Sequence, residues 1–283
     1  MENYVHSSAS FQSFDGLKLF YQKWLCKDAK GVVIIAHGLG EHSSRYSHLV
    51  EELAGKGVSF YALDHRGHGR SEGKRGHISS FSDFTADLAS LVEMARRENP
   101  AIPLILLGHS MGGVIAFQYV LQQSQAVDGL ILSSAGLIPI LDVPGWLQSL
   151  VKVLLSRIVP GLTISNGLDA SGLSHDQPIV NQYLDDPLVH DKVTARWFQE
   201  FAAAGQDSLN RAGELTLPLL IIHGQNDPIV DYKGSVKAME LASSSDKTLH
   251  IFEGLLHETM NEPQELRQEV LNRVGEWIVA HIS

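Results

Sequence analysis

Short, mostly apolar runs recur along this chain and alternate with longer stretches whose apolar residues follow helical spacing. Runs of this kind are typical of strands that are buried on both faces of a sheet. They predict strands over residues 32–36, 58–63, 104–107, 130–133, 218–223 and 248–252. Because helical stretches separate these strands, we expect βαβ crossovers and a mainly parallel sheet, which is an α/β fold.

The segments around these strands carry signals of their own. Helices are predicted over residues 84–95, from residue 111 onward and near residues 235–241. Asn261, with Gln264 three positions later, predicts a capping box at the start of the last helix. Near the N-terminus, Asp15-Gly16 lies between two β-prone runs and predicts an antiparallel hairpin over residues 11–24.

The alternation of strands and helices is interrupted once, over residues 137–212. We therefore predict a single domain over residues 1–283 with a helical cap inserted at about 137–212. Residues 146–159 form an amphipathic stretch in which only a narrow stripe is polar. The polar positions recur every fourth residue: Gln148, Lys152 and Ser156. Two interpretations stay open, a buried helix or a lid that touches lipid surfaces.

Composition limits the possible partners and location of the protein. The formal net charge is −10, which opposes binding to nucleic acid, and no polybasic segment suits anionic lipid. The single cysteine, Cys26, has no partner for an internal disulfide. The first residues lack the basic and apolar regions of a secretory signal, and the longest apolar stretch is too interrupted to span a bilayer. We therefore expect a cytoplasmic protein, with peripheral membrane contact left open and the oligomeric state undetermined.

Residues 108–112 carry the clearest chemical signal, the sequence G-H-S-M-G between a predicted strand and a predicted helix. A G-x-S-x-G pentapeptide also arises by chance, but in this context it is typical of a nucleophile elbow. Gly108 and Gly112 leave room for a sharp turn that exposes the Ser110 hydroxyl. The start of the next helix points free N–H groups toward the same place, so the Met111 N–H is half of a predicted oxyanion hole.

A serine nucleophile needs a histidine base and an acid that orients the histidine. In parallel sheets, sites form at the carboxyl ends of the strands, and Asp227 and His257 both directly follow a predicted strand. The chain order Ser110, Asp227, His257 is the order of an α/β-hydrolase triad. The alternatives are Asp207 or Asp231 as the acid and His250 or His281 as the base.

Two further motifs bear on this site. Residues 37–40, H-G-L-G, follow the first buried strand, and the glycines on either side of Leu39 let its N–H approach the position of the Met111 N–H. A plain turn is the alternative interpretation. Residues 257–261, H-E-T-M-N, have Asn261 where a zincin has its second histidine, so no metal and no cofactor is predicted.

Several motifs together resemble the monoacylglycerol lipase group of α/β-hydrolases, which also contains lysophospholipases and plant esterases. They are H-G-L-G-E-H-S-S-R-Y at 37–46, D-H-R-G-H-G-R-S-E-G at 64–73, G-H-S-M-G-G at 108–113 and H-G-Q-N-D at 223–227. The resemblance runs from about residue 10 to the C-terminus and implies an α/β-hydrolase fold with Leu39 and Met111 as oxyanion donors. It also implies that Glu41, Arg45 and Tyr183 surround the glycerol end of a lipid ester. The residues alone leave Glu41 and Arg45 open as an i, i+4 ion pair.

The resemblance implies a serine hydrolase that releases a fatty acid from monoacylglycerol through an acyl-enzyme, with Ser110, Asp227 and His257 as the catalytic residues. A lysophospholipase or a broad carboxylesterase has the same catalytic residues and is the alternative. A non-catalytic ligand-binding module is a third possibility, since a fold does not fix a function.

Overall fold

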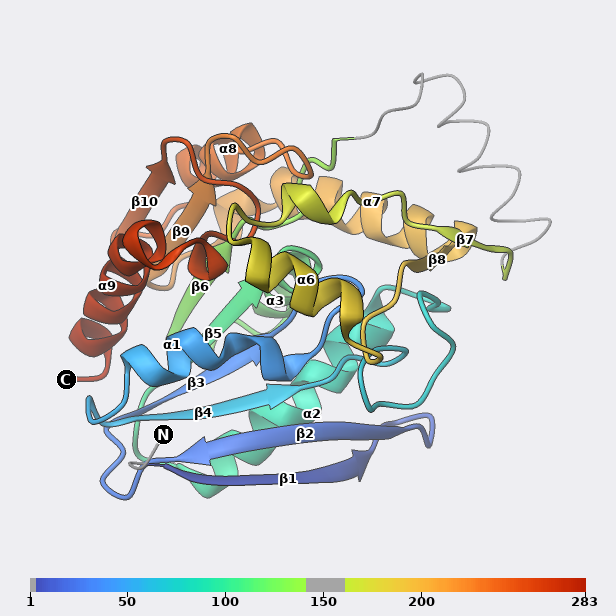
Figure 1. The fold of residues 1–283 in the computed structure, drawn as a ribbon. Helices are drawn as coiled ribbons and strands as arrows, with labels where there is room; N and C mark the ends of the chain where they lie inside the picture. Colours follow the sequence, from blue (N-terminus) through green and yellow to red (C-terminus); the bar gives the residue numbers. More distant parts are fainter. Residues whose placement is uncertain (1–3, 141–160) are drawn as a thin grey trace.

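A computed structural model describes residues 4–140 and 161–283 (Figure 1). At its centre lies an eight-stranded sheet in the order β1-β2-β4-β3-β5-β6-β9-β10. The strands are β1 (Val5–Gln12), β2 (Lys18–Leu25), β3 (Gly31–Ala36), β4 (Val58–Leu63), β5 (Leu104–His109), β6 (Gly129–Ser133), β9 (Leu219–Gly224) and β10 (Lys247–Phe252). In this sheet β2 runs antiparallel to both of its neighbours, β1 and β4, and the other neighbouring strands are parallel. This confirms the predicted mainly parallel sheet and its N-terminal hairpin.

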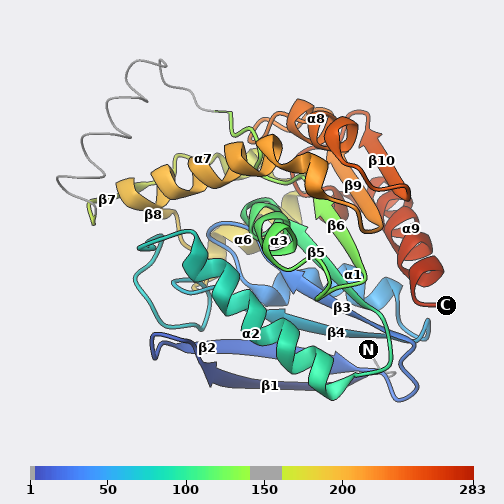
Figure 2. The ribbon, with the colours of Figure 1, turned by 180° about the vertical axis from the view of Figure 1, so that it is seen from behind.

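Alternate side chains of the buried strands face two helical layers, because successive residues of a strand point to opposite sides. Val32 and Ile34 of β3 join one core, whereas Val33 and Ile35 join the other. The first core is closed by α2 (Ser82–Glu98), α3 (Met111–Gln122) and α8 (Lys233–Leu241), seen in front of the sheet in Figure 2. The second is closed by α1 (Ser47–Glu52) and α9 (Gln264–His281), which lie in front in Figure 1.

The insertion between β6 and β9 covers the carboxyl ends of the strands (Figure 1). Its described elements are β7 (Thr163–Ser165), α6 (Gln177–Asp185), β8 (Lys192–Thr194) and α7 (Ala195–Asn210). The antiparallel pair β7 and β8 was not predicted. Helix α7 joins the core beside α3 through Trp197, Phe201 and Ala204. The amphipathic stretch 146–159 lies outside the described residues.

The predicted capping box at Asn261 is wrong. Helix α9 begins at Gln264 with Pro263 as its N-cap, after a short 3₁₀ turn over Thr259–Asn261. A residue that precedes proline is disfavoured in the helical region, so the helix cannot begin at Glu262. The Asn261 amide instead donates to Glu258 at 2.9 Å.

The remaining 3₁₀ turns of the described residues lie in loops: Ser43–Tyr46, Ala170–Gly172 and Ala212–Glu214. No helix within residues 4–140 and 161–283 combines the length and the apolar character needed to cross a bilayer.

Candidate active site

Ser110 lies at the turn between β5 and α3, and its backbone adopts φ +52° and ψ −116°. Positive φ is rare for a residue with a side chain and marks a strained position. Two glycines make this turn possible. A Cβ on Gly108 would lie 2.3 Å from the Gly112 carbonyl oxygen, and a Cβ on Gly112 would lie 2.0 Å from that of Ala36. The turn leaves Ser110 partly exposed between buried neighbours.

Asp227 and His257 meet at the carboxyl ends of β9 and β10. The His257 Nδ1–H donates to Asp227 Oδ2 at 2.6 Å, and both side chains are buried. The backbone N–H groups of Ile229 and Val230 donate to the other carboxylate oxygen, at 2.8 and 3.0 Å. Burial opposes ionisation of Asp227, but His257 and these donors hold its pKa well below the usual range. The carboxylate is therefore charged and fixed in orientation.

The charge around His257 favours its protonated form. Burial lowers the pKa of the imidazole, but Asp227, Glu258 and Glu41 more than offset burial and raise it above the usual value. Within the described residues, no hydrogen bond joins Ser110 Oγ to His257. In free enzymes this bond is often long and tightens only when substrate binds. Since Nδ1 carries the proton shared with Asp227, Nε2 is left as the basic nitrogen.

The loop after β3 lies against the elbow. A Cβ on Gly38 would be 3.3 Å from the Ser110 Cβ, so the loop and the nucleophile are in contact. Gly40 has φ +77° and packs against the His190 carbonyl, where a Cβ would be 2.4 Å away. The loop that carries Leu39 therefore lies beside Ser110, and the roles of the Leu39 and Met111 N–H groups as oxyanion donors stay a prediction.

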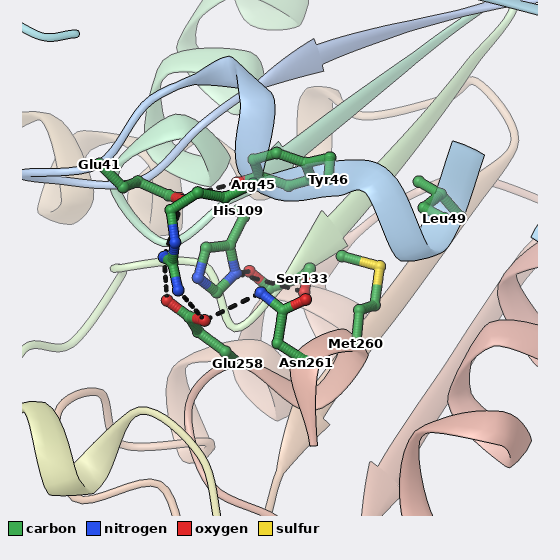
Figure 3. A pocket seen from close by; sticks show the side chains of 9 residues that line it. All are labelled: Glu41, Arg45, Tyr46, Leu49, His109, Ser133, Glu258, Met260 and Asn261. Atoms are coloured by element: carbon green, nitrogen blue, oxygen red, sulfur yellow. Dashed lines mark hydrogen bonds and ion pairs between the residues drawn. The ribbon is translucent and has the colours of Figure 1, made fainter. Parts of the chain in front are cut away.

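Glu41 and Arg45 belong to a buried network with Glu258, the residue that follows His257 (Figure 3). The Arg45 guanidinium donates to Glu41 at 3.0 Å and to both carboxylate oxygens of Glu258 at 2.6 and 2.8 Å. Glu41 also accepts from the Gly38 N–H at 2.6 Å and from the Tyr46 hydroxyl at 2.8 Å. Burial raises the pKa of the Glu41 carboxyl, but Arg45 and its other partners lower it to about 2.

A small cavity adjoins this network, with a volume of about 10 Å³, roughly the space of one water molecule. It is lined by Glu41, Arg45, Tyr46, Leu49, His109, Ser133, Glu258, Met260 and Asn261 (Figure 3). A glycerol group does not fit a space of this size.

Comparison with known proteins identifies the family. Residues 27–264 match the family described as serine aminopeptidase, S33. The chain is 38% identical to the monoacylglycerol lipase of Mycolicibacterium smegmatis, and the match covers 100% of both chains. It is 34% identical to the monoglyceride lipase of Mus musculus, over 95% of this chain and 89% of that one. The crystal structure of the Paleococcus ferrophilus monoacylglycerol lipase is similar with a TM-score of 0.83 at 33% identity, covering 98% and 99% of the two chains.

The chain belongs to the monoacylglycerol lipase family of α/β-hydrolases. Membership confirms the α/β-hydrolase fold and the family predicted from the resemblance, and the chain is a serine hydrolase. The roles of individual residues in this member rest on the geometry described above.

Some of the predicted site residues are in direct contact in the structure, and others lie on neighbouring elements. Asp227 and His257 are in contact, and Ser110, Leu39 and Met111 lie at the adjoining elbow and loop. Glu41 and Arg45 form the i, i+4 ion pair that the residues alone left open. Tyr183 lies on α6, and the Arg45 guanidinium stacks on its ring at 4.8 Å. The binding of glycerol by these three side chains stays a prediction.

The alternatives for the acid and the base have other partners. Asp207 bonds with Gln118, Asp231 accepts from the Lys233 N–H, His250 lies within β10, and His281 bonds with Asp246.

Sequence reasoning missed two buried side chains of the site. His223 donates its Nε2–H to Asp227 at 3.0 Å, and its Nδ1 accepts from the Ser235 hydroxyl at 2.7 Å. Glu258 follows His257 directly and pairs with Arg45, 213 residues away in the sequence. The spacing of four residues between His223 and Asp227 is the only local signal for the first contact. The Glu258 contact depends on tertiary structure alone.

Proposed function

We propose that this chain is a serine ester hydrolase that releases a fatty acid from monoacylglycerol, with Ser110 as the nucleophile, His257 as the general base and Asp227 as its orienting acid. The observation that carries the proposal is the buried Asp227–His257 pair beside a strained, partly exposed serine at an elbow. The full-length similarity to named monoacylglycerol lipases supports the substrate class. We further propose that the insertion at about 137–212 caps the site and allows transient contact with a micelle or membrane.

The reaction follows from the chemistry of these groups. Ser110 Oγ attacks the ester carbonyl carbon while His257 Nε2 takes its proton. Negative charge develops on the carbonyl oxygen and is stabilised by the N–H groups of Leu39 and Met111. His257 then protonates the departing glycerol oxygen, which leaves an acyl-enzyme. Water attacks the acyl carbon with His257 again as the base, and His257 returns this proton to Ser110 Oγ as the fatty acid departs.

The test is the release of oleate from a mono-oleoylglycerol emulsion by the wild type and by Ser110→Ala. We expect release to fall by at least roughly 10³-fold in the variant, because nothing else in the site replaces the nucleophile. Lysophosphatidylcholine and a short aryl ester are the comparison substrates. If the wild type hydrolyses only the aryl ester, and does so through Ser110, the assignment of Ser110 as the nucleophile holds. The assignment of monoacylglycerol as the substrate would then be wrong.

A further inference from the structure

The buried network of Glu41, Arg45 and Glu258 connects two loops that the proposed reaction needs at a fixed separation. At one end, the Gly38 N–H donates to Glu41, and Gly38 directly precedes the proposed oxyanion donor Leu39. At the other end, Glu258 is the chain neighbour of His257. Arg45 lies between the two carboxylates and donates to both (Figure 3). Hydrogen bonds and ion pairs therefore connect the loop that carries Leu39, here called the oxyanion loop, to the loop that carries His257, here called the histidine loop.

Arg45 is committed to the protein rather than to a ligand. Its side chain is 10% exposed, and those of Glu41 and Glu258 are 4% and 5% exposed. The bidentate pairing with Glu258 uses both terminal nitrogens, and one of these is shared with Glu41. Bidentate arginine–carboxylate pairs fix geometry as well as charge, which suits a rigid link between loops.

The network also carries excess negative charge next to the base. Two carboxylates and one guanidinium leave one uncompensated negative charge within the buried cluster. His257 contacts Asp227, the charges of Glu258 and Glu41 also act on it, and its ring lies 4.9 Å from that of His109. Burial and the neighbouring His257 lower the pKa of His109 to about 4, so His109 contributes no positive charge near neutral pH. Net negative charge near His257 therefore stabilises the imidazolium that forms during catalysis.

We propose that Arg45 and Glu258 are positioning residues: Arg45 bridges Glu41 and Glu258 and so holds the oxyanion loop and the histidine loop at one separation. The inference rests on the proposed function and assigns these side chains a role that is independent of the alcohol part of the substrate. The histidine loop has a second anchor on its other side, where the Leu256 N–H donates to Glu262 at 2.7 Å. Loss of the network is therefore expected to loosen the loop rather than unfold it.

The experiment compares two soluble esters with the same acyl group, 1-butanoylglycerol and methyl butanoate. Arg45→Met removes both ion pairs and is expected to lower kcat by roughly 10-fold to 100-fold on both esters, with KM within about twofold. Arg45→Lys is expected to restore part of the loss. Glu258→Gln removes a charge but keeps an oxygen acceptor, and it should move the acid limb of the kcat/KM profile to lower pH. Glu52→Gln, a surface change at an ion pair with Lys56, is the matched control.

The outcomes separate this inference from the proposed function. A raised KM confined to the glycerol ester would show that Arg45 binds glycerol, and an unchanged kcat on both esters would show that the network positions nothing. Either result overturns the inference. If the wild type hydrolyses neither butanoyl ester, the rate of Ser110 labelling by a fluorophosphonate becomes the readout, and oleate release from mono-oleoylglycerol still decides the proposed function separately. Slower labelling of Arg45→Met than of Glu52→Gln would still support positioning, and equal labelling would overturn it.

Discussion

Asp227 shows how one side chain organises the base. Its Oδ2 accepts from His257 and His223, and its Oδ1 accepts from the two backbone N–H groups of Ile229 and Val230. Four donors around one carboxylate keep it ionised and prevent its rotation. A fixed, charged acceptor at His257 Nδ1 sets the tautomer of the imidazole, which in turn leaves Nε2 free to take the serine proton.

Asp227→Asn is therefore expected to lower kcat by roughly 10⁴-fold, the loss typical when an amide replaces the triad acid and allows the wrong tautomer. The acid limb of any residual activity should move to lower pH, because the charge that raises the pKa of His257 is gone. Steady-state kinetics with a soluble ester measure both effects. Asp231→Asn is the matched control, since the Asp231 carboxylate accepts from the Lys233 N–H rather than from His257. Activity within tenfold of the wild type in Asp227→Asn would mean that another acid orients the base.

At the scale of elements, the loop after β3 lies close to the site because Gly38 has no side chain. Gly38 lies close to three side chains of the site. A Cβ there would lie 2.9 Å from Glu41 Oε1 and 3.3 Å from both Ser110 Cβ and His109 Cδ2. The loop is also held from below by His37, whose Nδ1–H donates to the Gly38 carbonyl and whose Nε2 accepts from the His65 N–H. Contacts with Ser110 on one side and hydrogen bonds of His37 on the other therefore fix the position of the loop.

Gly38→Ala is expected to push the oxyanion loop outward and to lower kcat by roughly 10-fold to 100-fold, because a displaced donor loses much of its effect on the transition state. The fold should survive, since the backbone at this position does not need positive φ. Gly213→Ala is the matched control, because its Cβ would meet nothing closer than 3.7 Å. Thermal unfolding and kinetics of both variants provide the measurement, and equal kcat in the two would contradict the proposed role of the loop.

At the scale of the whole molecule, the features that could be predicted correctly from the sequence are those with a local pattern. The buried strands were predicted because they are apolar on both faces. For β4, the predicted range of residues 58–63 is the observed one. Strand β1 begins at Val5, well before the predicted hairpin, because its small and polar residues form an exposed edge without an apolar pattern. Asp227 and His257 could be predicted as site residues because each closely follows a strand. The Arg45–Glu258 pair joins residues far apart in sequence and has no local signature.

The fold also buries histidines as neutral groups around the loop after β3. His37 lies 4.4 Å from His65 and 5.4 Å from His68, measured between ring centroids, and all three are buried. Burial lowers the pKa of each ring below its usual value. In the part of the chain that the structure describes, neither ring nitrogen of His65 has a hydrogen-bond partner. Protonation of these rings is therefore much easier in the unfolded chain than in the folded one.

This difference predicts that the free energy of unfolding falls as the pH drops below about 6.5, the usual pKa of histidine. Below that value the unfolded chain binds protons that the folded protein excludes, and each such histidine adds a slope of about 1.4 kcal/mol per pH unit. His257 has a raised pKa, so it titrates above pH 6.5; there its contribution has the opposite sign, and below 6.5 it adds little to the slope. Urea unfolding at pH 7.5, 6.5 and 5.5 measures the slope. His65→Leu removes one buried histidine without removing a side-chain hydrogen bond and should reduce the slope by about one histidine, whereas an unchanged slope would show that His65 does not titrate on unfolding.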